Sequence, residues 1–177
     1  MLNLRRGVLI CLLLAGTAGC DRVTKHFAIT ALAGAPHQSF LADTVRLQYH
    51  ENPGAFLATG ATWSPVARAV MFQFGNALIL AFAGFLAARY RWTRIARCGL
   101  LLFLAGGLSN LTDRIAIGGV IDFLNVGIGP IRTGIFNVAD VAIMAGVSMV
   151  VWEVLRLEGA AFRTAAAPEA RPRNTAA

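Results

Sequence analysis

Four long apolar segments, separated by shorter polar stretches, dominate the pattern of the chain. They cover about residues 7–32, 68–89, 95–113 and 135–156. Each is close to or above the roughly 20 residues that an α-helix needs to cross a bilayer. The pattern therefore predicts an all-α polytopic membrane protein with four transmembrane helices.

The composition agrees with this prediction. Of the 177 residues, 56% are hydrophobic and only 14% are charged, whereas a soluble domain carries about 25% charged residues. This argues against a disordered chain and against a soluble enzyme. The net charge of +7 does not by itself indicate nucleic acid, because arginines beside apolar segments mark membrane topology. We therefore expect no nucleic-acid partner.

The arginines gather before the first segment, between the second and third, and after the fourth. Basic residues favour the cytoplasmic side, so both termini and the middle loop are expected there. The sequence predicts a single domain over residues 1–163 and a disordered cytoplasmic tail over residues 164–177. The arginines concerned are Arg5, Arg6, Arg89, Arg91, Arg94, Arg97, Arg156, Arg163, Arg171 and Arg173.

Two connections then lie outside the cytoplasm. In the first, residues 44–49 alternate between polar and apolar side chains, which predicts a strand, and Asn52-Pro53-Gly54 follows as a turn. The second connection, residues 114–134, contains Gly118-Gly119 and the loop-like stretch Gly127-Ile128-Gly129-Pro130. We expect a small extracytoplasmic β element above the helices.

The first 20 residues also resemble a secretory signal. Two arginines and an apolar run precede Thr17-Ala18-Gly19-Cys20, which is similar to the lipobox at which lipoproteins are cut. Cleavage would leave three spans. The C-terminus, with its arginines, would then lie outside the cytoplasm, contrary to the positive-inside rule. We therefore expect residues 1–19 to remain, and a lipoprotein is the alternative.

Polar side chains interrupt the apolar segments mainly at their outer ends. Charged groups within a span are costly, so each is a candidate for a functional role. The residues concerned are Asp21, Lys25, Asn110, Asp113, Arg114, Asp122, Asn137 and Asp140. In the predicted topology they converge on one membrane surface, which predicts a site there.

Helical spacing relates several of these residues. Asp21 and Lys25 are four residues apart, which allows an ion pair; a helix-anchoring role and a functional role are equally open. Asn110, Asp113 and Arg114 share one helix face. Arg114 is suited to neutralise Asp113 or to hold a lipid phosphate or a substrate carbonyl.

Asp122 and Asp140 have apolar neighbours on both sides in the sequence. Apolar surroundings raise the pKa of a carboxyl group, and a second carboxylate nearby raises one of the pair further. Two aspartates that share one proton can act as base and acid on a water and a peptide carbonyl. The alternative is two unrelated aspartates that cap helices. No metal-binding motif such as HExxH occurs in the sequence.

With these residues in view, residues 7–157 resemble the lipoprotein signal peptidase family (signal peptidase II), aspartyl peptidases of the bacterial inner membrane. Five motifs in order carry the resemblance: Asp21-Arg22-Val23-Thr24-Lys25, Asn52-Pro53-Gly54-Ala55-Phe56, Gly107-Leu108-Ser109-Asn110-Leu111-Thr112-Asp113-Arg114, Val120-Ile121-Asp122-Phe123 and Phe136-Asn137-Val138-Ala139-Asp140. Many members have an additional small residue before the phenylalanine of the second motif, so the role of Phe56 stays open.

The resemblance implies that Asp122 and Asp140 are the catalytic dyad. It also implies a set of substrate-binding or site-lining residues, with Asn110, Arg114 and Asn137 positioning the substrate or the dyad. The complete set is Asp21, Lys25, Asn52, Gly54, Asn110, Asp113, Arg114 and Asn137.

The resemblance further implies the reaction. The substrate would be a diacylglyceryl-modified prolipoprotein, cut just before its lipidated cysteine near the periplasmic face of the inner membrane, with no cofactor or metal. Membrane lipids and a monomeric state are the other expectations. A transporter or proton relay is the main alternative and predicts acids spread through the membrane depth. A scaffold, in which the aspartates only cap helices, is another.

Overall fold

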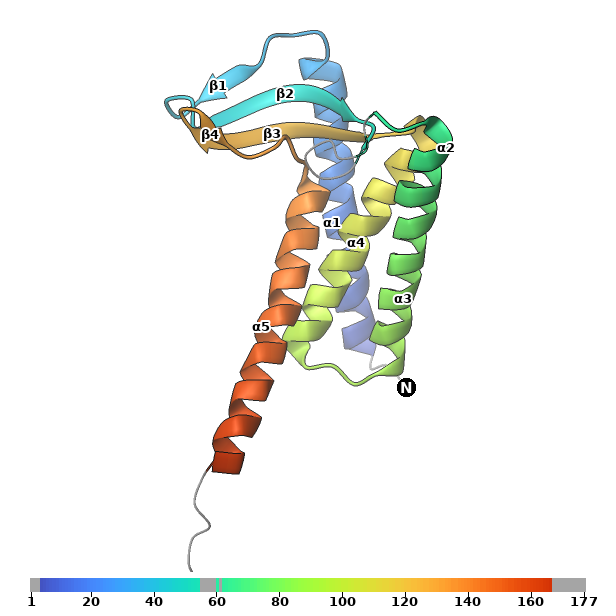
Figure 1. Ribbon diagram of the computed structural model, residues 1–177, viewed down its shortest axis with the longest axis vertical. Helices are drawn as coiled ribbons and strands as arrows, with labels where there is room; N and C mark the ends of the chain where they lie inside the picture. Colours follow the sequence, from blue (N-terminus) through green and yellow to red (C-terminus); the bar gives the residue numbers. More distant parts are fainter. Residues whose placement is uncertain (1–3, 55–59, 61, 167–177) are drawn as a thin grey trace, which may run out of the picture.

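Long helices stand side by side in this protein, and a small sheet lies across one end of them (Figure 1). The computed structural model describes residues 4–54, 60 and 62–166. Within this part of the chain, α1 continues into the π-helical η1, and α2, η3 and α3 form one continuous helical run. The bounds are α1 Leu4–Phe27, η1 Ala28–Leu32, α2 Pro65–Arg68, η3 Ala69–Phe74, α3 Gly75–Arg89, α4 Arg94–Ile117 and α5 Val138–Ala166.

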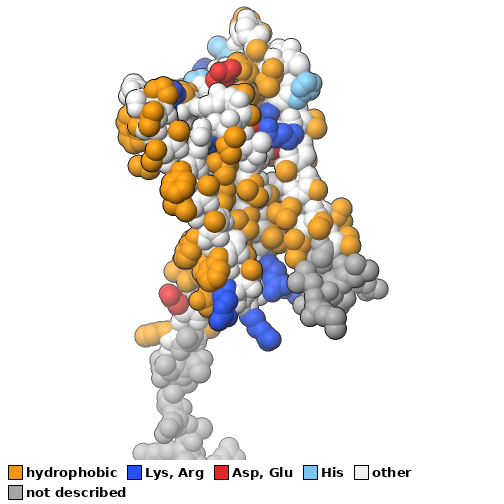
Figure 2. Space-filling model, turned by 90° about the vertical axis from the view of Figure 1, so that its right-hand side faces the viewer, with side chains coloured by type: hydrophobic (Ala, Val, Ile, Leu, Met, Phe, Trp, Pro, Cys, Tyr) orange, Lys and Arg blue, Asp and Glu red, His pale blue; other side chains and the backbone are white. Residues whose placement is uncertain are grey.

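Three helical stretches of the described residues are long and apolar enough to cross a membrane: Pro65–Arg89, Arg94–Ile117 and Val138–Ala160. Helix α1 is not among them, but it packs against α4 and α5. It begins, and α5 ends, at the end of the molecule opposite the sheet (Figure 1). Hydrophobic side chains cover much of the helical surface, and basic side chains gather at the end away from the sheet (Figure 2).

Helices α4 and α5 make the most extensive contact in the fold, and glycines allow their backbones to approach. A Cβ atom added at Gly99 would lie 2.6 Å from the carbonyl oxygen of Gly146. One added at Gly146 would lie 2.7 Å from the backbone nitrogen of Phe103, and one at Gly106 would overlap the carbonyl oxygen of Ala139. Small residues serve this purpose in membrane helix pairs, because lipid offers little hydrophobic drive for association.

The sheet has four antiparallel strands in the order β1-β2-β3-β4. Its long central pair aligns His50 with Asp122 and Asn52 with Val120, and the register shifts between Leu47 and His50. Apolar side chains of β3 pack on those of η1 in a small core, so the sheet is fixed to the upper end of α1. The strands are β1 Gln38–Phe40, β2 Val45–Asn52, β3 Val120–Ile128 and β4 Ile131–Arg132.

The predicted helical character and the small β element are confirmed, and the strand predicted at residues 44–49 is β2. In the second connection, α4 continues to Ile117 and strand β3 follows, which the sequence pattern did not predict. Gly118, at φ +75°, ends α4, a backbone conformation that glycine adopts without strain.

The fourth apolar segment becomes helical at Val138 rather than at residue 135. The reason is that Phe136 still pairs with Leu124 of β3. At its other end α5 continues to Ala166, so the first three residues of the expected tail, 164–166, are helical. Residues 167–177 lie outside the described residues.

Candidate active site

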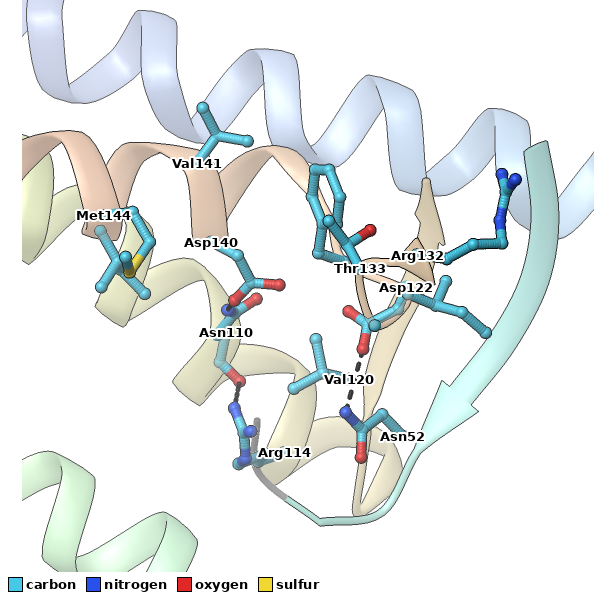
Figure 3. Close-up of a pocket in the computed structure, with 14 residues that line it drawn as sticks. Asn52, Asn110, Arg114, Val120, Asp122, Arg132, Thr133, Asp140, Val141 and Met144 are labelled. Carbon is cyan, nitrogen blue, oxygen red and sulfur yellow. Dashed lines mark hydrogen bonds between the residues drawn. The ribbon is translucent and has the colours of Figure 1, made fainter. Parts of the chain in front are cut away.

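A cavity of about 630 Å³ lies beside the sheet, where β3, α4 and α5 come together (Figure 3). The carboxylates of Asp122 and Asp140 both belong to its wall, one from the sheet and the other from a helix. The lining residues are Asn52, Asn110, Arg114, Val120, Asp122, Arg132, Thr133, Gly134, Ile135, Phe136, Asp140, Val141, Ile143 and Met144. Half of these residues are polar or charged, but most of the surface that they expose to the cavity is apolar.

Asp122 lies in the buried first half of β3, with only 2% of the residue exposed. Its two carboxylate oxygens accept hydrogen bonds from the side-chain amides of Asn52, at 3.0 Å, and of Asn137, at 2.6 Å. Burial raises the pKa of Asp122 from its ordinary value of 3.8 to about 6, and the negative charge of Asp140 acts in the same direction. The group therefore exchanges its proton close to neutral pH.

Asp140 lies in the first turn of α5, where hydrogen bonds at the start of the helix fix its carboxylate. Its Oδ2 accepts a hydrogen bond from the backbone N–H of Asn137, at 3.1 Å, and its own backbone N–H donates to Asn137 Oδ1, at 2.9 Å. This reciprocal arrangement resembles a capping box. Its other oxygen accepts the side-chain amide of Asn110, at 2.8 Å.

Two asparagines connect the two carboxylates. Asn137 is fully buried, and its side-chain amide donates to Asp122 and, at 3.3 Å, to Asn110 Oδ1. Asn110 in turn donates to Asp140. The chain of contacts Asp122–Asn137–Asn110–Asp140 therefore fixes the two acids relative to each other with neutral donors.

Behind the cavity lies a buried ion cluster centred on Lys25, which is the only lysine in the sequence. Its Nζ lies 2.7 Å from Asp21 Oδ2 and 2.7 Å from Asp113 Oδ2, and it donates to Asn110 Oδ1 at 2.9 Å. Three donors thus meet three acceptors, which suits an ammonium group. The ion pair predicted from the spacing of Asp21 and Lys25 is present.

The same cluster ties three helices together. Arg22 makes a 2.7 Å ion pair with Asp113, so two cations balance two anions. Asp21 accepts the Ser109 hydroxyl of α4 at 2.6 Å and the backbone N–H of Ala139 in α5 at 2.9 Å. Arg22 and Ser109 lie within the quoted motifs, but sequence reasoning did not single them out as site residues. The cluster holds the start of α5, and with it Asp140, against α1 and α4.

Arg114 reaches the cavity from the last turns of α4. Its Nη2 donates to the carbonyl of Gly54 at 3.0 Å, and its Nη1 to the carbonyl of Asn110 at 3.3 Å. Within the described part of the chain, its buried Nε has no hydrogen-bond partner. Asn52 and Gly54 are both buried at the end of β2, and Asn52 Oδ1 accepts the Gly54 N–H at 3.0 Å.

The expected site residues thus divide into two groups. Five of them line the cavity, namely Asn52, Asn110, Arg114, Asp122 and Asp140. The others support it from behind or, as Gly54 does, through a backbone contact to Arg114. Ala55 and Phe56 of the second motif lie outside the described residues.

Sequence reasoning missed Arg132, at the end of β4, and residues 133–135 that follow it, all of which line the cavity. Arg132 donates to the carbonyl of Asp43 at 2.7 Å and also contacts Asn125, so the β3–β4 hairpin is attached to the β1–β2 turn. The separation of 89 residues between Arg132 and Asp43 leaves no local pattern from which this contact is predictable.

Comparison with known proteins gives a consistent result. The family described as "Signal peptidase (SPase) II" matches residues 11–156. A lipoprotein signal peptidase of Desulforapulum autotrophicum is 32% identical over 155 residues, covering 87% of this chain and 96% of that protein. One from Burkholderia thailandensis is 34% identical over 140 residues, covering 77% and 81%. A bacterial membrane enzyme structure, determined by the in meso method at 2.3 Å, has the same fold, with a TM-score of 0.73, 22% identity and coverage of 84% and 88%.

Proposed function

The chain belongs to the signal peptidase II family, and on that premise we propose that it is an aspartyl endopeptidase of the bacterial inner membrane. Membership in this family implies a protease that processes lipoprotein signal peptides. In the proposed reaction, the substrate is a diacylglyceryl-modified prolipoprotein, and the bond cut is the one just before the lipidated cysteine.

The observation that carries this proposal is the placement of Asp122 and Asp140 on one cavity, joined through two asparagines. One aspartate takes a proton from water as the water oxygen attacks the scissile carbonyl carbon. The other gives a proton to the departing nitrogen of the cysteine. The products are a signal peptide with a new carboxylate and a lipoprotein with a free amine on its lipidated cysteine.

The pKa of about 6 at Asp122 supports an acid–base role, because a group of this kind works best when its pKa lies near the working pH. Asn110 and Asn137 are the positioning residues, since each donates to one of the acids. The unpartnered Nε–H of Arg114 is suited to a substrate carbonyl.

The apolar wall of the cavity is suited to a lipidated substrate. Phe136, Ile143 and Met144 line it together with Val141, and both Val141 and Met144 are more than half exposed on α5. The wall is therefore continuous with a helix surface that would face lipid. We propose that acyl chains attached to the cysteine reach the cavity along this surface.

The proposed topology has four spans, with both termini cytoplasmic and the sheet on the periplasmic face. Three apolar helices support it, as does the position of the start of α1 and the end of α5 at the same end of the molecule (Figure 1). The arginine-rich loop between α3 and α4 lies at the end away from the sheet, as the positive-inside rule requires of a cytoplasmic loop.

A gel-shift assay tests the proposed function. The purified protein in lipid is mixed with a diacylglyceryl-modified prolipoprotein and, separately, with the same precursor before lipidation. We expect cleavage of the lipidated form alone. Cleavage of both forms would contradict the proposed substrate class, and cleavage of neither, under conditions where an active family member cuts, would contradict the proposed activity.

A further inference from the structure

A second cavity of about 630 Å³ lies far from the two aspartates, where α1, the α3–α4 loop and the start of α4 meet. Its wall includes Ile10 and Leu13 of α1, Trp92 of the loop, and Arg94, Arg97, Cys98 and Leu101 of α4. None of these residues takes part in the candidate active site. The cavity therefore needs an explanation of its own.

The charged side chains that line this cavity are all positive. Arg94 and Arg97 are three residues apart on α4, which places both guanidinium groups on one face of the helix. Within the described ranges neither of them forms an ion pair. The buried acid Glu153, which contacts Thr93 at the start of α4, accepts hydrogen bonds from Arg156 at 2.7 and 2.8 Å. Two positive charges thus remain for an external anion.

The rest of the wall is apolar or interfacial. Ile10, Leu13 and Leu101 offer hydrocarbon contacts beside the guanidinium groups. The indole of Trp92 is fixed, because its Nε1–H donates to the carbonyl of Leu86 at 2.8 Å, and tryptophan is enriched where headgroups meet acyl chains. A ligand that fits this wall has an anionic head and an apolar tail.

We propose that this cavity binds an anionic phospholipid of the cytoplasmic leaflet. The phosphate lies against Arg94 and Arg97, and an acyl chain lies along Ile10, Leu13 and Leu101. Basic pockets between membrane helices on the cytoplasmic side are known to hold such headgroups. Figure 2 shows that basic side chains gather at this end of the molecule, in keeping with the charge of the ligand. The site goes beyond the peptidase activity and rests only on the proposed topology, which places this end of the molecule in the cytoplasmic leaflet.

Trp92 provides a direct probe of the cavity. The protein contains three tryptophans, so a variant with Trp63→Phe and Trp152→Phe reports on Trp92 alone. It is placed in lipid nanodiscs with a series of increasing mole fractions of phospholipid whose acyl chains are brominated, because bromine quenches indole fluorescence. The brominated lipid is either phosphatidylglycerol, which is anionic, or phosphatidylcholine, which is zwitterionic.

We expect the anionic lipid to quench Trp92 at a lower mole fraction than the zwitterionic one. Each arginine contributes roughly fivefold to the preference, so Arg94→Gln together with Arg97→Gln is expected to reduce it more than fivefold. The matched control, Arg89→Gln with Arg91→Gln, removes the same charge from the neighbouring end of α3 and the α3–α4 loop, at residues that do not line the cavity. It is expected to keep the preference.

Equal quenching by the two lipids would overturn the proposal. An equal loss of preference in the two double variants would also overturn it, because the attraction would then be a property of the whole basic surface. Relief of the quenching by soluble glycerol phosphate would support the proposal, because the free headgroup would then compete with the lipid for Arg94 and Arg97.

Discussion

Asn137 and Asp140 bind each other reciprocally across the first turn of α5. The backbone N–H of each donates to the side-chain oxygen of the other, at 3.1 Å from Asn137 and 2.9 Å from Asp140. Asp140 is therefore both a helix-capping residue and a candidate catalytic acid. Its capping contacts hold the carboxylate at one position in the cavity, so the two roles support each other.

Substitutions of Asn137 separate its contribution to the helix cap from its contribution to positioning Asp122. Serine is a good N-cap residue but lacks the amide that reaches Asp122. We expect Asn137→Ser to keep most of the thermal stability, and Asn137→Ala to lose about 1 kcal/mol more because the cap is lost. Both variants are expected to lose at least tenfold in kcat. Thermal unfolding and cleavage kinetics measure the two effects, and a serine variant with normal kcat would refute the positioning role.

Replacing Lys25 tests the buried ion cluster. Lys25→Gln removes the ammonium that faces Asp21 and Asp113, and loss of one partner from a buried pair costs about 3–5 kcal/mol. We expect a large fall in the midpoint of thermal unfolding. Arg46→Gln serves as the comparison, because Arg46 pairs with the half-exposed Asp43 and pairs near the surface contribute about 1 kcal/mol or less. Similar shifts in the two variants would contradict the assigned importance of the cluster.

The raised pKa of Asp122 predicts a dependence of stability on pH. The folded state binds this proton more tightly than the unfolded chain, with a pKa of about 6 against 3.8. Asp122 therefore lowers stability progressively as the pH rises from about 4 to about 6, by an amount on the order of 3 kcal/mol. Asp122→Asn has no such titration.

We therefore expect the stability of Asp122→Asn, relative to the unchanged protein, to increase from pH 4 to pH 6 and then to level off. Thermal unfolding of both proteins between pH 4 and pH 8 provides the comparison. A difference that stays constant for Asp122→Asn would mean that its pKa is not raised.

The contact between α4 and α5 predicts an asymmetry between glycines. An alanine at position 146 would overlap Gly99 and lie 2.7 Å from the backbone nitrogen of Phe103, so Gly146→Ala is expected to cost about 1–3 kcal/mol. Gly84, on α3, has no atom within 4 Å of an added Cβ. Gly84→Ala is expected to be neutral or stabilising, because alanine favours helix. Equal effects on thermal stability would argue against the tight helix contact.

Much of the helical fold and the general location of the site could be predicted from the sequence. The helices follow from hydrophobicity averaged over about 20 residues, and the contacts within one helix follow from local spacing. Apolar length marks the helices α3, α4 and α5, and the i,i+4 spacing of Asp21 and Lys25 is sufficient to predict their ion pair. The convergence of polar groups in one region followed from the predicted topology.

The sequence was less informative where partners are distant or strands are buried on both faces. Residues 120–123 of β3 are all buried, so they show no alternation between polar and apolar positions, and the strand was not predicted. The contact of Lys25 with Asp113 crosses 88 positions of the chain. Neither this contact nor the place of Arg132 in the cavity wall leaves a local signal.

The most direct test of the account is cleavage of a diacylglyceryl-modified prolipoprotein by the Asp122→Asn and Asp140→Asn variants. Loss of a group that transfers a proton costs about 100-fold or more, so both variants are expected to lose cleavage while remaining folded in the membrane. Glu158→Gln is expected to cut normally. If either aspartate variant processes the substrate at nearly the normal rate, the two carboxylates are not a catalytic pair, and the capping role of Asp140 is the only one that stands.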